Sequence, residues 1–398
     1  MNFKLFMMAA LLLTGCSACG GSDNNATGNP DTPDNPGTPD NPSTEKVDFA
    51  KGADISWYTE YEKKGYKFYN ASGQERDCTT LMKELGLDAI RLRVWVDPKE
   101  HNNWCDKWDV VAKAKKAASL GMDVMVDFHY SDWWADPGQQ HKPAAWEGLG
   151  LADLRKALAD HTKEVLNALK SAGVTPKWVQ VGNEIRPGML WDEDVNLSGA
   201  SWDVKANEVK DKEWTSTEVK YPKNWKNLGA FITTGYEAVK AVCPEAIVIV
   251  HLDNGYDQGL YQWFFDELKN NGGKWDMIGM SIYPYWTMQE HKEYTEDKTI
   301  TDCISNIKFV SARYNCDVMI VETGMECGDG NGGVASASKL QQGKTLLTRL
   351  IKESRDNTNG RCKGVFYWEP ECRPNEGYPL GAFTNDGKPT VIMDAFKE

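Results

Sequence analysis

Short apolar runs alternate with longer amphipathic stretches along most of the chain, from residue 47 onward. Several runs, such as VMVDF, IVIVHL and VMIVE, are apolar at nearly every position, which is typical of parallel strands buried on both faces. The pattern predicts eight strands, at residues 52–56, 89–94, 123–128, 178–182, 246–252, 277–282, 318–322 and 364–368.

The stretches between these runs have the period of helices. In DLRKALADHTKEVLNALKSAG, for example, Leu154, Leu158 and Val165 lie on one stripe, and a glycine follows the last turn. The same period predicts further helices at residues 79–85, 108–120, 228–242, 261–271, 303–314 and 339–353.

Eight strand-then-helix units without a second linker predict one α/β domain, a (β/α)8 TIM barrel with enlarged βα loops. A doubly wound open sheet is the competing fold. However, no GxGxxG follows the first strand and the chain has no P-loop, so nucleotide binding has no support.

Composition agrees with a globular protein and narrows its partners. Of the 398 residues, 41% are hydrophobic and 26% are charged, which excludes a disordered, collagenous or multi-spanning membrane chain. The net charge of −13 repels phosphate backbones, so we expect no nucleic-acid partner. The 16 Trp residues outnumber both Tyr and Phe, and a groove that stacks on flat ligand faces needs more indole rings than a core does.

The first 46 residues have the features of a targeting signal followed by a linker. Lys4 precedes an apolar run too short to span a bilayer, and the run ends in Leu-Thr-Gly-Cys16, which resembles a bacterial lipobox. The resemblance implies that Cys16 carries a lipid; an ordinary secretory signal with an incidental cysteine is the alternative. Residues 17–46 hold no aliphatic side chain larger than alanine and repeat TPDNP, which predicts a disordered linker.

We therefore expect three parts: a lipoprotein signal peptide at 1–16, the linker at 17–46 and a folded domain at 47–398. Such a protein is exported and lipid-anchored to the bacterial cell envelope, and we expect it on the outer membrane, facing outside.

The eight cysteines beyond residue 46 include no CxxC pair and no cysteine–histidine cluster with the spacing of a zinc site. In an exported protein some of them can form disulfides, while buried free thiols are the alternative. Their spacing does not reveal a connectivity.

Polar, titratable and aromatic residues end the predicted strands, although the strands themselves are apolar. In a barrel of this kind the active site lies at the carboxyl ends of the strands. Glu184 ends the fourth strand and Glu322 the seventh, which places two carboxyl groups across the barrel mouth. A glycosidase needs such a pair, because one carboxyl protonates the leaving oxygen while the other acts at the sugar carbon. A salt bridge or a loop hydrogen bond is the better explanation only for a lone strand-end glutamate.

Several motifs resemble those of one family of glycosidases. VQVGNE, VETG and YWEP are similar to strand ends of the clan A glycoside hydrolases, which are retaining enzymes on this barrel. GADISW, RLRVW, DFHYSDWWADPGQQHKPAAW, VQVGNEIRPGMLW, HLDNG, IGMSIYPYW and VETGM together resemble glycoside hydrolase family 53. The resemblance covers residues 50–398 and implies endo-hydrolysis of β-1,4-galactosidic bonds in galactan and type I arabinogalactan by double displacement.

The resemblance also implies roles for individual residues. Glu184 is expected to be the general acid/base, Glu322 the nucleophile, and Asn183 a hydrogen-bond partner of the sugar 2-hydroxyl. Either Arg91 or Arg93 is expected to keep Glu322 ionised, because a nearby cation lowers the pKa of a carboxyl group.

The remaining predicted site residues line the groove. Trp368 is expected to be the platform under the reacting sugar, and Tyr283 to bond the nucleophile. The others are polar or aromatic residues at or after strand ends: Asp54, Trp95, His129, Trp133, Trp134 and Trp286. Loop packing is the alternative for each outer tryptophan, and a structural hydrogen bond is the alternative to ligand contact for His251 and Asp253.

Catalysis is expected to need no cofactor. Some bacterial members of the family hold calcium in the loop after the seventh strand, but here that loop reads ECGDGNGG and offers few of the six to eight oxygen ligands that calcium prefers. A structural calcium ion stays open, and a disulfide between Cys327 and Cys372 is an alternative link between the loops.

We expect a monomer whose partners are a polysaccharide and, through the lipid alone, a membrane. Two other functions stay open. One is another clan A β-glycanase, such as a mannanase or a xylanase, because only the loops set the sugar. The other is a carbohydrate-binding lipoprotein without activity, which the presence of both carboxyl groups disfavours.

Overall fold

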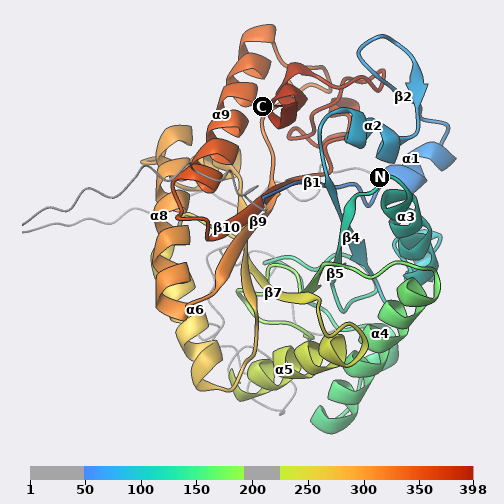
Figure 1. The fold of residues 1–398 in the computed structure, drawn as a ribbon, viewed down its shortest axis with the longest axis vertical. Coiled ribbons are helices and arrows are strands. Elements are labelled where there is room, and N and C mark those ends of the chain that lie inside the picture. Colours follow the sequence, from blue (N-terminus) through green and yellow to red (C-terminus); the bar gives the residue numbers. More distant parts are fainter. Residues whose placement is uncertain (1–48, 192–224, 398) are drawn as a thin grey trace, which may run out of the picture.

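The computed structural model describes residues 49–191 and 225–397, so the predicted signal peptide, Cys16 and the linker lie outside the described residues. Eight parallel strands close into a barrel in the order β1-β10-β9-β8-β7-β6-β5-β4 (Figure 1). They are β1 Ala50–Asp54, β4 Ala89–Val94, β5 Asp123–Phe128, β6 Trp178–Val181, β7 Ile247–Leu252, β8 Met277–Ile282, β9 Asp317–Thr323 and β10 Cys362–Trp368. The predicted TIM barrel and its eight strands are confirmed.

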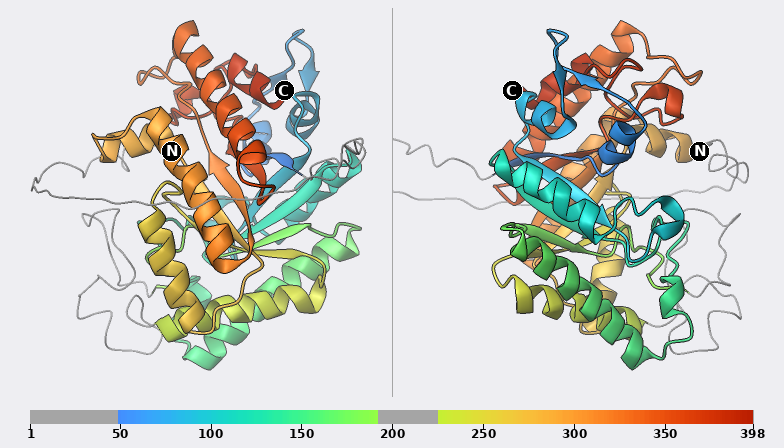
Figure 2. Two further views of the ribbon diagram at one scale, coloured as in Figure 1. Left: turned by 60° about the vertical axis from the view of Figure 1, so that its left-hand side comes forward. Right: turned by 90° about the vertical axis from the view of Figure 1, so that its right-hand side faces the viewer.

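Helices surround the barrel, as the side views in Figure 2 show. The seven predicted helices are all present: α2 Cys78–Glu84, α3 Lys107–Ser119, α4 Leu151–Ser171, α5 Trp225–Val242, α6 Gln258–Asn270, α8 Glu296–Tyr314 and α9 Ala337–Asp356. Several begin at a capping side chain that the sequence displays, such as Asp77 before α2 and Asp106 before α3.

The hydrophobic pattern misses the shortest elements. These are helices α1 Tyr58–Lys63 and α7 Pro284–Glu290 and the small hairpin of β2 Phe68–Tyr69 and β3 Glu75–Arg76. Neither helix has a capping side chain, and one or two turns are too short to show a period. Single 3₁₀ turns lie at Lys99–His101, Ala144–Trp146 and Pro374–Glu376, and a longer 3₁₀ segment lies at Val391–Lys397.

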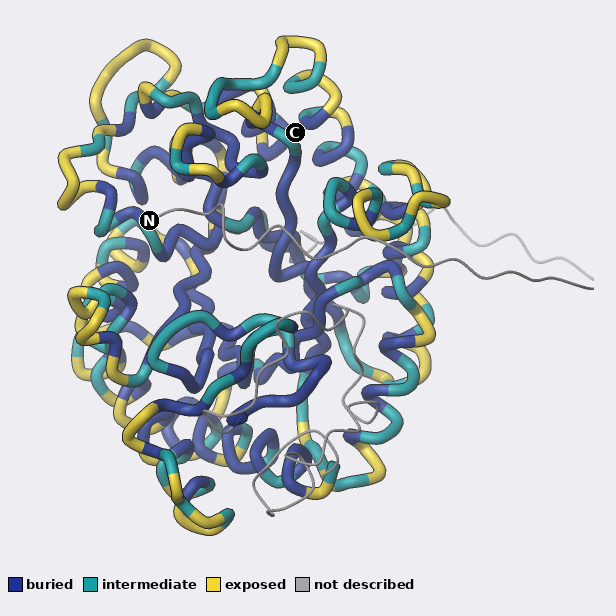
Figure 3. Tube along the Cα trace, turned by 180° about the vertical axis from the view of Figure 1, so that it is seen from behind, coloured by how far each residue is buried: buried dark blue, intermediate teal, exposed yellow. Residues whose placement is uncertain are grey.

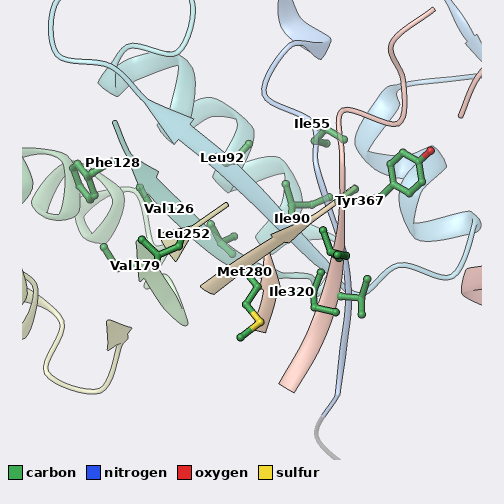
Figure 4. Close-up of a cluster of buried hydrophobic side chains, with 14 of the residues drawn as sticks. Ile55, Ile90, Leu92, Val126, Phe128, Val179, Leu252, Met280, Ile320 and Tyr367 are labelled. Carbon is green, nitrogen blue, oxygen red and sulfur yellow. The ribbon is translucent and has the colours of Figure 1, made fainter. Parts of the chain in front are cut away.

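The strands are buried on both faces, and exposed residues concentrate on the helices and outer loops (Figure 3). Outward-facing apolar side chains pack under the helices; Figure 4 labels Ile90, Leu92, Val126, Val179 and Ile320 among them. The absence of alternation in the strand sequences is the direct result of this two-sided burial.

Bulky side chains fill the barrel interior, and glycines on neighbouring strands leave room for them. The rings of Trp178 and Phe366 meet edge to face with their centroids 6.0 Å apart. A Cβ atom added to Gly52, on the adjacent strand β1, would lie 2.3 Å from the Phe366 ring. The close approach therefore requires glycine at residue 52, for packing rather than for flexibility.

All eight cysteines in the described part of the chain are free thiols, so the alternative of buried free thiols holds and Cys327 and Cys372 form no disulfide. Each of the two is buried beside a different polar partner. The Cys327 Sγ lies 3.7 Å from the carbonyl oxygen of Phe383, and the hydroxyl of Tyr61 donates to the Cys372 Sγ at 3.5 Å.

Among the described helices, none is both long and apolar enough to cross a bilayer.

Because the described thiols are free, we expect reductant to leave the melting temperature unchanged. Thermal melts with and without dithiothreitol should agree within about 1 °C, since the loss of a native disulfide costs about 2–5 kcal/mol and lowers the melting temperature by many degrees. Thiol titration of the unfolded, unreduced chain should count all eight cysteines beyond residue 46, in addition to any free thiol at Cys16 and Cys19. A melting temperature that falls by several degrees in reductant would contradict the assignment.

Candidate active site

The inward-facing positions of the barrel change from apolar to polar toward the carboxyl end of each strand. On β4 the series is Ala89, Arg91, Arg93, and on β5 Met125 is followed by Asp127. The corresponding residues on β6, β7 and β8 are Trp178 and Gln180, Ile249 and His251, and Gly279 and Ser281. The two-residue period of strands thus places a floor of apolar side chains directly beneath a buried polar layer.

Glu322 is aligned with this layer by an irregularity in β9. The register between β8 and β9 shifts by one residue there, so that Glu322 pairs with Ser281 while Ile320 pairs with Met280. The Glu322 side chain is 7% exposed. Its Oε1 lies 2.8 Å from Arg91 Nη1, and its Oε2 accepts a hydrogen bond of 2.9 Å from the Tyr283 hydroxyl. Each carboxylate oxygen is therefore held by one donor, which fixes the orientation of the group.

Arg91 binds more than one carboxylate. Its Nη1 lies 2.8 Å from Asp54 Oδ2 as well, and its Nη2 lies 2.9 Å from Asp127 Oδ2 and 2.8 Å from Asn183 Oδ1. Asp54, Asp127 and Arg91 are fully buried, so Asp54 and Arg91 hold the site from behind and do not line the groove. Of the two arginines expected beside Glu322, Arg91 is the one that contacts it.

Burial raises the pKa of Glu322 to about 7, although the adjacent Arg91 and the Tyr283 hydroxyl oppose the shift. Asp127 and Asp54 add to it, because both are negative and share the same guanidinium.

Glu184 has a different environment. It follows β6 in a left-handed conformation, with φ of 48°, and its half-buried carboxyl group accepts a hydrogen bond of 2.6 Å from the Ser281 hydroxyl at Oε1. Burial raises its pKa well above the ordinary value, and repulsion by Glu322 and Asp253 adds to the shift. Within the described residues, the groups that most affect Glu184 include no cation, so Glu184 is the carboxyl that keeps its proton while Glu322 ionises.

Arg93 faces a tryptophan cluster instead of Glu322. It forms an ion pair with Glu369, which directly follows Trp368. Glu369 has a left-handed backbone conformation, with φ of 45°. The guanidinium carbon of Arg93 lies 5.1 Å from the ring centroid of Trp57, 5.2 Å from that of Trp95 and 4.2 Å from that of Trp134. Of the two alternatives, Arg91 is thus the partner of Glu322, and Arg93 holds aromatic rings by cation–π contacts.

The tryptophan cluster consists of Trp57, Trp95, Trp133, Trp134 and Trp368. Trp57 lies between Trp134 and Trp368: its ring centroid is 5.3 Å from that of Trp134 and 5.8 Å from that of Trp368. All three rings are partly exposed. Trp133 is partly exposed beside Trp95, whereas Trp95 is 1% exposed. A sugar cannot stack on Trp95 in this structure, so its role is to support the cluster.

His129 also lies behind the groove. Its Nε2 is 3.0 Å from Asp127 Oδ2, and its Nδ1 accepts hydrogen bonds from the Trp95 indole and the Ala135 backbone. Asn183 is nearly buried, and its Nδ2 donates to the Ala135 carbonyl. Trp286, on α7, packs against Tyr285 with centroids 4.6 Å apart; α7 follows β8, opposite β4 in the barrel order.

Sequence reasoning did not single out several residues of the site: Trp57, Gln180, Ser281 and Glu369. Trp57 follows the first strand and belongs to the motif GADISW, which is its signal. Gln180 and Ser281 occupy inward positions two residues from apolar ones, so strand phase could have found them.

The loop after β9 offers few oxygen ligands for a calcium ion. Its one aspartate, Asp329, accepts hydrogen bonds at Oδ1 from the backbone nitrogens of Asn331 and Gly333, and the Asn385 side chain donates to the Gly332 carbonyl. Within the ranges 49–191 and 225–397, no three His, Cys, Asp or Glu side chains are grouped so that they could hold a metal.

Replacing Glu184 by glutamine should stabilise the fold. The folded-state pKa of Glu184 lies above that of an unfolded glutamate, about 4.3, so the native state retains a proton that the unfolded chain releases, and stability falls as pH rises above that value. Glutamine does not ionise. We expect Glu184→Gln to have a higher melting temperature and a higher free energy of unfolding than the wild type. The difference in free energy should grow from about pH 5 to about pH 8, where it reaches about 1 kcal/mol.

Thermal melts at the two pH values measure this margin, and Glu245→Gln, on the exposed surface, controls for the loss of one negative charge. A margin that is equal at both pH values would show that the Glu184 carboxyl is not shifted.

Comparison with known proteins agrees with the geometry. Residues 50–390 match the sequence profile of Glycosyl hydrolase family 53. The chain is 28% identical to the endo-β-1,4-galactanase of Bacillus subtilis (strain 168), over 99% of this chain and 86% of that protein. A structure from a study of two fungal β-1,4-galactanases superposes with a TM-score of 0.72 at 26% identity, covering 88% of this chain and 99% of that one. The structure of the Ignisphaera aggregans GH53 catalytic domain superposes with a TM-score of 0.71 at 28% identity, covering 89% of this chain and 97% of that one. The chain belongs to glycosyl hydrolase family 53.

Proposed function

We propose that this protein is an arabinogalactan endo-β-1,4-galactanase, which hydrolyses internal β-1,4-galactosidic bonds with retention of configuration. The observation that carries the proposal is the pair of carboxyl groups after β6 and on β9 in opposite environments. The cation Arg91 and a tyrosine hydroxyl hold Glu322, while the described groups that most affect Glu184 are other carboxyl groups and the Ser281 hydroxyl. Family membership and the printed names of the relatives support galactan as the substrate.

The chemistry takes two steps. In the first, Glu184 gives its proton to the glycosidic oxygen as the bond from C1 to that oxygen breaks, and Glu322 forms a bond to C1. In the second, Glu184 takes a proton from water, the water oxygen bonds to C1, and the bond to Glu322 breaks. This double displacement requires carboxyl groups about 5–5.5 Å apart.

Nearby donors assist the nucleophile and the sugar. The two hydrogen bonds to Glu322 favour its ionised form in the first step and stabilise it as a leaving group in the second. Asn183 Oδ1 is occupied by Arg91, and one N–H of its amide by Ala135, so the second N–H is the group that would donate to the 2-hydroxyl.

The tryptophan cluster is the proposed platform for the non-reducing side of the chain. Its residues end β10 or follow β1, β4 and β5, and β10 lies opposite β6, which Glu184 follows. Because the acid lies beside the leaving group, the sugars away from it rest over Trp368, Trp57 and Trp134. Trp286, opposite β4, is the candidate for the other side.

The protein should cleave galactan well and other β-1,4-glycans poorly. The axial 4-linkage bends galactan, so a flatter chain would misplace hydroxyls and leave buried polar groups unpaired at about 1–3 kcal/mol each. Two such mismatches suppress turnover by about 30-fold or more. Reducing-end assays on galactan, mannan, xylan and cellulose test this, with viscosity and product length reporting endo action.

Glu322→Ala should abolish activity on all four polymers, which shows that the signal comes from this site. Comparable rates on mannan or xylan would assign the protein to another clan A β-glycanase. Release of galactose alone would refute endo cleavage.

We also propose that the protein is a monomeric lipoprotein, exported through its signal peptide and anchored by Cys16 to the outer membrane, facing outside. The lipobox-like sequence and the linker support this location, which suits an enzyme whose substrate is a large polysaccharide. The membrane is then a partner through the lipid only.

Cys16→Ala should prevent lipidation and release the protein from membranes, while activity on soluble galactan stays at the wild-type rate. Membrane fractionation and metabolic labelling with a fatty acid measure the two effects, and wild type treated in parallel is the control. A variant that stays membrane-bound and labelled would contradict the anchor.

A further inference from the structure

A chain of three buried side chains runs from the barrel interior to the carboxyl group of Glu184. The Ser281 Oγ lies 2.6 Å from Glu184 Oε1, the His251 Nε2 lies 2.8 Å from that Oγ, and the Gln180 Nε2 lies 3.0 Å from His251 Nδ1. Gln180 and His251 are 0% exposed and Ser281 is 2% exposed. The three come from β6, β7 and β8, at the inward positions of the polar layer.

The neighbours of the chain determine the direction of its hydrogen bonds. Gln180 Oε1 accepts a hydrogen bond from Arg91 Nη2 at 3.3 Å, and its Nε2 donates one N–H to Asp127 Oδ1 at 2.5 Å. The amide nitrogen then directs its other N–H at His251 Nδ1. The backbone nitrogen of Glu184 also points at His251 Nδ1, at 3.4 Å. Two donors converge on Nδ1, so Nδ1 is an acceptor and the imidazole proton is on Nε2.

Asn183 Oδ1 lies 3.0 Å from the same Nδ1 but does not require a proton there. That oxygen already accepts a hydrogen bond of 2.8 Å from Arg91 Nη2. With the proton on Nε2, His251 donates to the Ser281 oxygen, and the Ser281 hydroxyl hydrogen is left for Glu184 Oε1. Every donor in the chain then points toward Glu184, and aligned hydrogen bonds of this kind polarise one another.

The other groups around Glu184 oppose its ionisation. Glu322 on β9, Asp253 after β7 and Asp136 after β5 are negative and raise the pKa of Glu184. The Ser281 hydrogen bond has the opposite effect, because it favours the carboxylate. The hydroxyls of Tyr261 and Tyr283 are buried, and their pKa values are raised well above the ordinary value.

The chain itself carries no charge at the pH at which galactan is cleaved. Burial and the nearby Arg91 lower the pKa of His251 well below its usual value, so the imidazole is neutral. The chain therefore acts on Glu184 by hydrogen bonding and not as a cation.

We propose that Ser281 and His251 are positioning residues that stabilise the ionised form of Glu184, so that one carboxyl group can serve as acid in the first step and as base in the second. The inference rests on the proposed function, which assigns Glu184 that double role. Ser281 donates to Oε1, so the reacting proton is on Oε2. It passes to the glycosidic oxygen as the bond to C1 breaks, and a proton from water replaces it. The hydrogens of the chain stay in place throughout.

The pH dependence of kcat/KM on soluble galactan tests the role of Ser281. The alkaline limb reports the loss of the Glu184 proton, and without the Ser281 donor the carboxylate is less stable. We expect Ser281→Ala to move that limb upward by about one pH unit. Ser281→Thr keeps a hydroxyl and should restore the limb of the wild type. Circular dichroism and melting curves establish that both variants fold. An alkaline limb that stays in place, or moves down, in folded Ser281→Ala overturns the proposal.

A second measurement uses the unaltered full chain and needs no substrate. The protein has six histidines, so selective ¹⁵N-histidine labelling gives a small set of imidazole signals, and His251→Gln identifies the one that disappears. We expect His251 to be neutral, with its proton on Nε2, at every pH at which the enzyme is active. A proton on Nδ1, or a charged ring, overturns the proposal.

The two failures are distinguishable. A wild type that does not cleave galactan refutes the proposed function and leaves the histidine result to be read on its own. An active wild type whose alkaline limb does not respond to Ser281→Ala refutes only the inference.

Discussion

The buried guanidinium of Arg91 holds the mouth of this barrel together. It binds Asp54 from β1, Asp127 from β5, Glu322 from β9 and the amide of Asn183 after β6. Removing so many charges from water is costly, and only a planar group with several donors can satisfy them at once. The position of the nucleophile, the placement of Asn183 and the closure of the polar layer all depend on this one side chain.

The two carboxyl groups differ in environment, and the proposed division of roles follows from that difference. Glu322 lies against a cation that is shared among three acids, so its ionisation is opposed by burial but not forbidden. Within the described residues, Glu184 accepts a hydrogen bond from the neutral Ser281 hydroxyl, and its charge must form in the presence of other acids. The same residue type can thus supply the proposed acid and the proposed nucleophile, and the difference arises from which strand each side chain ends.

Much of the fold follows from the sequence, because two-sided burial leaves continuous apolar runs such as VMVDF and IVIVHL. Glu184 and Glu322 could be found because strand ends in a barrel meet at one rim. The partner of each arginine could not be found, since Arg91 and Arg93 share a strand and a face, and only the three-dimensional structure separates Glu322 from Glu369. Trp95 illustrates the same limit: its indole resembles a platform in sequence, but the packing of Trp133 and Trp134 buries it.

The left-handed backbone after β6 and β10 has a consequence for engineering. Glu184 and Glu369 both adopt a conformation that costs a non-glycine residue about 1–2 kcal/mol. Glycine at residue 369 would leave the buried Arg93 without its ion-pair partner, at a cost of about 3–5 kcal/mol that outweighs the relief. Glycine at residue 184 would relieve the backbone and remove a buried carboxyl group, so a library selected for heat tolerance alone would be drawn toward losing the proposed acid/base. Directed evolution of this barrel therefore has to select for turnover as well as for heat tolerance at every round.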